Sequence, residues 1–202
     1  MANNILGIDD HYLRFPTDGW GGTDLNNLDM ITPWYDIQQR VNPKKVIEIG
    51  MFAGHASLLM MKVFENLESL VSYDPSGTSE RNAKQIKKHY SQFTFYREPI
   101  WGNEDRHTDI DLIFVDGCHE DDYPIKDIKS CMKIKPRYIL ADNIEKPDVR
   151  IATKLQYTLW DVKYDPIYYF YSNIKYSTIT KKTLKSPGIM GLFKMEGNYV
   201  SL

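Results

Sequence analysis

The sequence predicts a single α/β domain in which helices cover a mostly parallel sheet. Three observations predict this fold class. Short runs of β-branched and aromatic residues alternate with amphipathic helical patterns between residues 45 and 141. The chain has 202 residues, a length that suits one domain with one sizeable core. Glycines and carboxylates follow several of the predicted strands, as expected where parallel strands end at a ligand-binding edge.

Composition and charge narrow the class of protein. Hydrophobic residues make up 42% of the chain, charged residues 26%, and the net charge is −2. This charge predicts no general attraction to nucleic acid or to an anionic membrane. No apolar run is long enough to cross a bilayer, and the first residues do not resemble a signal peptide. The only cysteines, Cys118 and Cys131, form neither a metal pair nor a disulfide framework. We therefore expect a cytoplasmic protein with reduced thiols.

The first predicted element is a helix that follows an extended arm, and together they occupy residues 1–42. Thr32 is a candidate N-cap, with Pro33 in the first turn. Asn42 and Pro43 end the pattern. The residues of the expected buried face are Trp34, Ile37 and Val41.

The cofactor-binding core is predicted to span residues 43–165. Its expected strands are residues 45–49, 70–74, 93–97, 110–115 and 136–141, and its expected helices are residues 54–65, 79–89, 121–132 and 147–159. Residues 98–109 are too few for a full crossover helix.

The C-terminal region, residues 166–202, is rich in tyrosine and is expected to form strands. Residues 162–165 and 190–195 are the expected antiparallel pair. The order of all these elements predicts a doubly wound, Rossmann-like, mostly parallel seven-stranded sheet with helices on both faces and an antiparallel C-terminal strand.

The most informative motif is VIEIGMFAGHAS, residues 46–57, in which a strand runs into a glycine loop and a helix. Gly50 and Gly54 let the backbone approach a ligand closely. Asp74 ends the next strand, 24 positions after Gly50, where it can accept hydrogen bonds from a ribose diol. The spacing ExGxxxG differs from the GxGxxG that cradles a pyrophosphate, and no lysine follows Gly54. These features favour a ligand with a ribose but no phosphate.

Further polar side chains follow the fourth and fifth predicted strands. Asp116 and His119 lie in FVDGCHEDDY, and Asp142 and Asn143 lie in LADNIEKPDV. Because neighbouring parallel strands end at one edge, we expect these side chains to lie near one another. Asp116, Asp142 and Asn143 would present hard oxygen ligands, which suit Mg²⁺ or Ca²⁺ better than zinc. Taken singly, each of these residues could equally be an ordinary loop or turn residue.

The glycine loop and Asp74 resemble those of the class I S-adenosylmethionine (SAM)-dependent methyltransferases. The resemblance covers about residues 46–149 and implies SAM as the cofactor. One departure is that Ser57 follows Gly54 by three residues, whereas many family members have a serine two residues after that glycine. The residues that the resemblance assigns to the cofactor are Glu48, Gly50, Gly54, Ser57, Asp74 and Asp116.

The paired acidic motifs are similar to those of metal-dependent small-molecule O-methyltransferases, the catechol and caffeoyl-CoA group and their bacterial relatives. This resemblance implies that Asp116, Asp142 and Asn143 hold a divalent cation, Mg²⁺ or Ca²⁺. His119 occupies the position of the lysine base of the catechol type, and Asp-x-x-His also looks like the macrolide-sugar O-methyltransferases, in which histidine is the base. Asp116 and His119 are therefore the candidate catalytic residues. An imidazole, with an ordinary pKa of roughly 6.5, can take a proton near neutral pH.

The expected function is transfer of a methyl group from SAM to a hydroxyl of a small molecule, assisted by a divalent cation. Expected partners are a small hydroxylated acceptor and, in one reading of the tyrosine-rich C-terminal region, a second copy of the chain. Two alternatives stay open. One is a metal-independent methyltransferase of the same fold, and the other is a SAM-binding or degenerate domain that serves as an interaction module.

Overall fold

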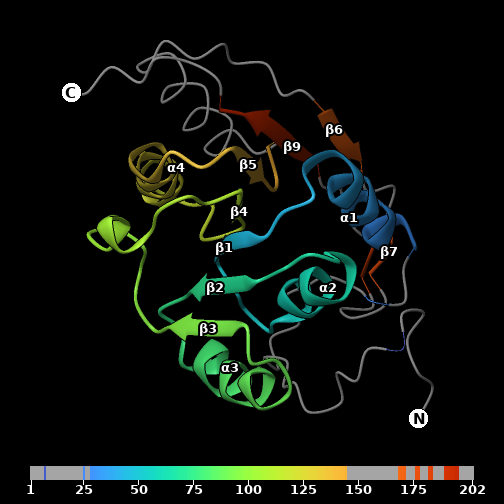
Figure 1. Ribbon diagram of the computed structural model, residues 1–202, viewed down its shortest axis with the longest axis horizontal. Coiled ribbons are helices and arrows are strands. Elements are labelled where there is room, and N and C mark those ends of the chain that lie inside the picture. The colour runs from blue at the N-terminus through green and yellow to red at the C-terminus, as the bar shows by residue number, and fades with distance from the viewer. Residues whose placement is uncertain are drawn as a thin grey trace.

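The structure is a computed structural model, and it describes residues 7, 25, 28–144, 168–171, 176–177, 182–183 and 189–195. The main sheet has seven strands in the order β3-β2-β1-β4-β5-β9-β6. The first five pair in parallel, and β9 runs antiparallel to both β5 and β6. Figure 1 shows these strands side by side, with α4 on one side of the sheet and α1 and α2 on the other. The predicted Rossmann-like, mostly parallel sheet with an antiparallel C-terminal strand is confirmed.

The strands of the sheet are short and mostly apolar. They are β1 (Lys45–Ile49), β2 (Ser69–Tyr73), β3 (Phe93–Tyr96), β4 (Leu112–Val115), β5 (Tyr138–Ala141), β6 (Tyr168–Tyr171) and β9 (Ile189–Lys194). Every residue of β4 and β5 is buried, as expected of central parallel strands covered on both faces. A separate antiparallel pair is formed by β7 (Tyr176–Ser177) and β8 (Lys182–Thr183).

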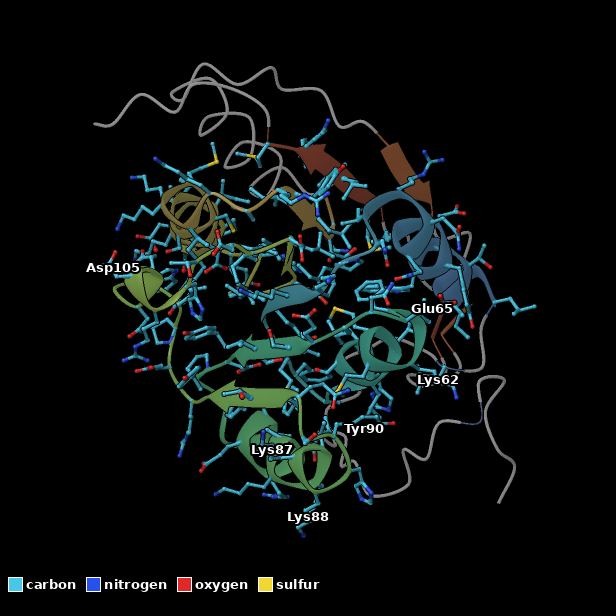
Figure 2. All side chains as sticks on the ribbon, viewed as in Figure 1. Lys62, Glu65, Lys87, Lys88, Tyr90 and Asp105 are labelled. Atoms are coloured by element: carbon cyan, nitrogen blue, oxygen red, sulfur yellow. The ribbon has the colours of Figure 1, made fainter. Side chains whose placement is uncertain are left out.

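The helices are α1 (Leu28–Val41), α2 (His55–Val63), α3 (Gly77–His89) and α4 (Tyr123–Ile134), with one 3₁₀ turn, η1 (Glu104–Arg106). Only η1 lies between β3 and β4, so the predicted shortening of that crossover is confirmed. Figure 2 shows that the labelled side chains of Lys62 on α2 and of Lys87 and Lys88 on α3 lie at the periphery of the molecule. Among the described residues, no helix combines the length and the apolar character needed to cross a membrane.

The core divides into two layers because successive side chains of a strand point to opposite faces of the sheet. Val46 and Leu70 pack with α1, α2 and α3 on one face. Ile47 and Ile113 pack with α4 on the other face. This alternation decides where the polar residues of the strands point, which matters for Glu48 below.

Several predicted boundaries differ from the structure. The first helix begins at Leu28, and Pro33 lies inside it, so Thr32 is not its N-cap. Ile31 and Trp34 are almost fully buried, and their packing offsets the hydrogen bond that Pro33 cannot donate. The helix predicted at residues 147–159 and the strand predicted at residues 162–165 lie outside the described residues. The strand predicted at residues 190–195 is β9, and its described partners are β5 and β6.

Candidate functional site

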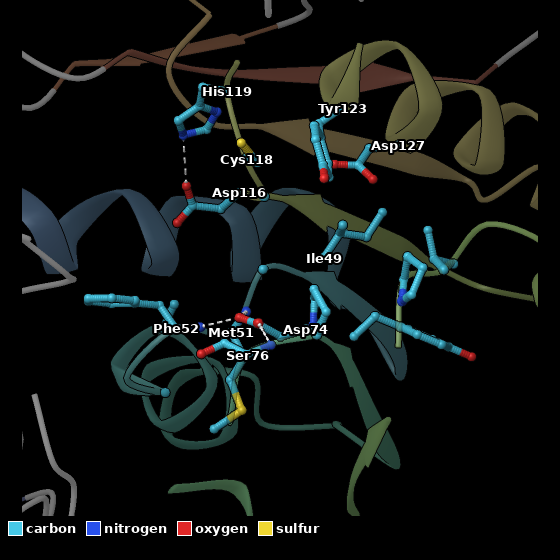
Figure 3. A pocket seen from close by; sticks show the side chains of 18 of the residues that line it. Ile49, Met51, Phe52, Asp74, Ser76, Asp116, Cys118, His119, Tyr123 and Asp127 are labelled. Atoms are coloured by element: carbon cyan, nitrogen blue, oxygen red, sulfur yellow. Dashed lines mark hydrogen bonds and ion pairs between the residues drawn. The ribbon is translucent and has the colours of Figure 1, made fainter. Parts of the chain in front are cut away.

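A cavity of about 740 Å³ opens at the carboxyl ends of β1, β2 and β4. Its volume is within the range of small-molecule sites in proteins. Four segments line it. They are the glycine loop after β1, the segment after β2, the link before β4, and the segment that runs from the end of β4 into α4. Figure 3 shows Asp116 and His119 at the upper left, Tyr123 and Asp127 at the upper right, and Asp74 below both groups.

Gly50 and Gly54, both predicted at the cofactor, line the cavity. Each has a φ of +89°, a conformation that glycine adopts without strain. A Cβ atom at Gly50 would lie 2.1 Å from the carbonyl oxygen of Asp116, so the loop after β1 touches the end of β4 directly. The turn that opens the cavity thus requires glycine at this position.

Asp74 lies at the mouth of this loop and is 9% exposed. Its Oδ2 accepts hydrogen bonds from the backbone N–H groups of Met51 (3.1 Å) and Phe52 (2.8 Å), and its Oδ1 accepts one from Ser76 (2.8 Å). A carboxylate has about four acceptor positions, and these three bonds leave room for a ligand hydroxyl. Asp74 therefore both shapes the loop and faces the cavity, as the sequence predicts for a ribose-binding carboxylate.

Glu48 and Ser57 are fully buried and are not among the residues that line the cavity. Glu48 points to the α2 face of the sheet, where Ser57 Oγ donates to its Oε2 at 2.6 Å and Ser72 Oγ donates to the same oxygen. Burial raises the pKa of Glu48 from 4.5 to about 7, against the effect of the two serine bonds. The carboxylates of Asp116 and Asp74 raise it further. Glu48 thus connects β1 to α2 and β2 through the two serine hydroxyls.

Asp116 and His119 form a pair at one end of the cavity. His119 Nε2 lies 3.4 Å from Asp116 Oδ1, and both residues are partly exposed and line the cavity. The backbone N–H of Asp116 donates to the carbonyl of Ile49, which anchors the end of β4 against β1. An aspartate beside an imidazole orients the ring and stabilises its protonated form. The pair thus has the composition of a proton-accepting dyad.

The predicted metal ligands are brought together only in part. Asp142 follows β5 directly beside Asp116, because its N–H donates to the carbonyl of Val115. However, Asp142 and Asn143 are not among the residues that line the cavity, and Asp116 faces His119. The described residues contain no group of three or more histidine, cysteine, aspartate or glutamate side chains placed to hold a metal ion. Two aspartates and an asparagine do not make up such a group, so the cation at Asp116, Asp142 and Asn143 stays a prediction of the resemblance.

Asp127 and Trp101 are among the cavity residues that sequence reasoning missed. Trp101 lies in the short link before β4, and its Nε1 donates to Asp127 Oδ1 at 2.8 Å. Asp127 is 4% exposed, and burial raises its pKa to about 6. The signal for Asp127 was its spacing, because it lies three residues after Pro124 and four before Cys131 on the buried side of α4.

Comparison with known proteins places this cavity in a familiar fold. Residues 47–137 match the model of a family described as a methyltransferase domain. No curated protein matches the chain.

Several solved structures share the fold. A methyltransferase of Podospora anserina, PaMTH1, solved with S-adenosylhomocysteine (SAH), is 16% identical, with a TM-score of 0.60 over 91% of this chain and 83% of that one. The O-methyltransferase of Bacillus cereus in complex with SAH is 13% identical, with a TM-score of 0.59 over 86% and 84%. The methyltransferase domain of the bacterial protein CtHen1 is 19% identical, with a TM-score of 0.54 over 85% and 100%. At these identities, the matches show the fold and not the acceptor.

Proposed function

Because this chain carries a class I SAM-dependent methyltransferase domain, we propose that it transfers the methyl group of SAM to a hydroxyl oxygen of a small molecule. The observation that carries the proposal is the placement of Asp116 and His119 in the same cavity as the glycine loop and Asp74. The net charge of −2 favours a small acceptor over a nucleic acid.

Cofactor binding uses the central part of the cavity. Asp74 would hold the ribose hydroxyls of SAM, and the glycine loop at Gly50 would hold its methionine part. Asp116 and His119, which line the same cavity, would then act on the acceptor. SAM supplies an activated methyl group, so the protein has to align the acceptor and remove its proton.

The proton is taken by His119. When bound, SAM would supply the methyl group to the acceptor oxygen, with SAH and the hydroxyl proton as the other products. Asp116 holds the hydrogen on Nε2 of His119, so the other ring nitrogen takes the hydroxyl proton. The negative charge of Asp116 then stabilises the imidazolium. This route corresponds to the metal-independent alternative and needs no cation.

The test combines a screen for the methyl acceptor with a variant that removes the proposed base, His119. Radiolabelled SAM is incubated with panels of phenols, catechols and sugars, and labelled products are identified by mass spectrometry. With an acceptor in hand, His119→Ala should lower the single-turnover rate by roughly 10²–10⁴-fold and leave SAH affinity almost unchanged. The wild-type rate should rise with pH as the imidazole loses its proton, and that rise should vanish in the variant.

His89→Ala is the matched control, because His89 is an exposed histidine on α3 outside the cavity. It should behave as the wild type does. A His119→Ala enzyme with a normal rate and an unaltered pH profile would show that another group carries the proton. Failure of wild-type protein to bind SAH would instead favour an interaction module.

A further inference from the structure

A hydrogen bond that the reaction described above does not use joins Tyr73 to His107. Tyr73 ends β2 and lines the cavity, whereas His107 directly follows η1 and does not line it. Tyr73 Oη lies 2.6 Å from His107 Nε2, and the two rings meet edge to face with their centroids 5.5 Å apart. Tyr73 is almost fully buried, so this bond replaces one that its hydroxyl would otherwise make with water.

The β3–β4 link, residues 98–109, supplies one wall of the cavity. Two bonds attach this link to α4. Trp101 Nε1 donates to Asp127 Oδ1 at 2.8 Å, and Ser130 Oγ donates to Glu104 Oε1 at 2.8 Å. The bond between the phenol and the imidazole attaches the same link to β2. If that bond is lost, the link can stay with α4 and move away from β2, which separates two walls of the cavity.

The groups around His107 favour its neutral form. Burial lowers the pKa of His107, and the positive charge of neighbouring Arg106 lowers it further. Arg106 pairs with Glu98 at 2.6 Å and lies over the ring of Tyr96 on β3. That ring stacks on Tyr73, with the centroids 5.1 Å apart. A second positive charge at His107 would therefore lie half-buried beside the first.

Protonation of His107 also changes what its ring can bond to. Burial raises the pKa of Tyr73 to about 12, so its hydroxyl keeps its proton and can donate. A neutral imidazole can accept this bond through Nε2, but an imidazolium carries hydrogens on both nitrogens and accepts none. Because the pKa of His107 is lower in the attached link than in water, the attachment is strongest above pH 6.5. It weakens as the pH falls from 6.5 through the lowered pKa.

We propose that the hydrogen bond between Tyr73 and His107 is a pH-sensitive latch, which holds the β3–β4 link against β2 and releases it when His107 is protonated. Figure 2 shows the labelled Asp105 of η1 at the periphery of the molecule, so the link has room to move outward. Release widens the cavity and should weaken cofactor binding in acid. This effect on affinity rests on the proposed function, whereas the release of the link does not.

Hydrogen–deuterium exchange of the wild-type protein, corrected for the intrinsic effect of pH on exchange, measures the release directly. The amides of residues 98–109 should lose protection between about pH 7.5 and about pH 5.0, the range in which an imidazole takes up its proton. Calorimetry over the same range should show that the affinity for SAH falls about fivefold or more, a usual size for coupling between two sites.

His107→Gln separates the latch from the other groups that titrate. Its amide oxygen can accept the hydroxyl of Tyr73 at every pH, so affinity and protection at about pH 7.5 should match the wild type. Glu48, Asp127 and His119 titrate in both proteins. The ratio of the variant's affinity for SAH to that of the wild type therefore isolates His107, and it should rise about fivefold or more toward pH 5.0.

His89→Gln is the matched control, because it removes an exposed histidine of α3 outside the cavity. It should follow the wild type at both pH values. Equal protection of the link at the two pH values would overturn the latch, and so would a His107→Gln protein with the pH dependence of the wild type. Wild-type protein that binds no SAH at either pH but loses protection in acid would support the latch and overturn the proposed function.

Discussion

At the scale of single residues, Asp74 carries two roles that one carboxylate can combine. It accepts three backbone hydrogen bonds that shape the glycine loop, and it faces the cavity. Sequence position alone marked it as a ribose ligand, but the loop contacts became visible only in the structure. Loss of this side chain should therefore affect both binding and stability.

Asp74→Ala should weaken SAH binding at least about tenfold, because each bond to a carboxylate contributes roughly 1.5–3 kcal/mol. Asp111→Ala is the matched control. Its Oδ2 accepts the N–H groups of Lys44 (2.9 Å) and Lys45 (3.1 Å), and it lies at the opposite end of the strands. Calorimetry should show weakened binding for Asp74→Ala only. Equal affinities for the two variants would remove Asp74 from the site.

Glu48 is the residue whose protonation should change stability most clearly with pH. Its pKa is raised to about 7 by burial, so the folded protein holds a proton that the unfolded chain releases near pH 4.5. The stabilisation is complete below pH 4.5 and is lost as the pH rises through 7. The difference corresponds to about 3 kcal/mol.

Chemical denaturation of wild-type protein and Glu48→Gln across this range measures the effect. The wild type should lose stability relative to the variant as the pH rises. Glu104→Gln should show the opposite sign at lower pH, where the wild type should lose stability relative to this variant as the pH falls below 4.5. Burial alone would raise the pKa of Glu104, but bonds from its own backbone N–H, Ser130 and Lys133 lower it overall. Parallel curves for Glu48→Gln and wild type would contradict this account of Glu48.

At the scale of elements, the turn from β1 to α2 controls the shape of the cavity. Gly50 lies so close to the backbone of Asp116 and Gly117 that no side chain fits between the loop and the end of β4. The acidic residue at the end of β2 then closes the loop from the other side. The ends of β1, β2 and β4 together shape the cavity, although they are far apart in the sequence.

Comparison of Gly50→Ala with Gly102→Ala separates the cost of steric crowding from the cost of backbone strain in the free energy of unfolding. Both glycines have a positive φ, +89° and +81°, but only Gly50 has backbone atoms within reach of a Cβ, at 2.1, 2.6 and 2.7 Å. Each alanine costs roughly 1–2 kcal/mol for its conformation. Gly50→Ala should cost about 1–3 kcal/mol more, because the neighbouring strand ends must move. Equal unfolding free energies would show that the loop adapts freely.

At the scale of the whole molecule, the order of the strands brings Asp116 and Asp142 together from two different crossovers. The resemblance to metal-dependent enzymes rests on the two sequence motifs that contain these aspartates, and in the structure Asp116 also lies 3.4 Å from His119. A cation held by Asp116 and Asp142 and a proton-accepting pair of Asp116 and His119 predict different responses to a chelator.

Because the route through His119 needs no cation, we expect methyl transfer to continue at its normal rate in EDTA. The rate of labelled product formation with and without EDTA, and after addition of Mg²⁺, measures this. A rate that falls in EDTA and returns with Mg²⁺ would establish the cation site predicted at Asp116, Asp142 and Asn143. The cofactor and fold assignments would stand in either case.

The sequence by itself determined the class of fold, the glycine loop and the residues at the strand ends. These features follow from local patterns. The spacing of hydrophobic residues, the turn residues and the carboxylates at strand ends can each be recognised within a short segment of the sequence. Gly50, Gly54, Asp74, Asp116 and His119 all line the cavity, and their roles in binding and catalysis stay predictions.

Only the tertiary structure decided which side chains meet. Glu48 was predicted at the cofactor, but the alternation of β1 turns it toward α2 and its partners Ser57 and Ser72. Trp101 and Asp127 are separated by 25 residues, and the packing of α4 against the link before β4 joins them at the cavity. Such contacts depend on how layers pack over long sequence separations, and no local pattern encodes that packing.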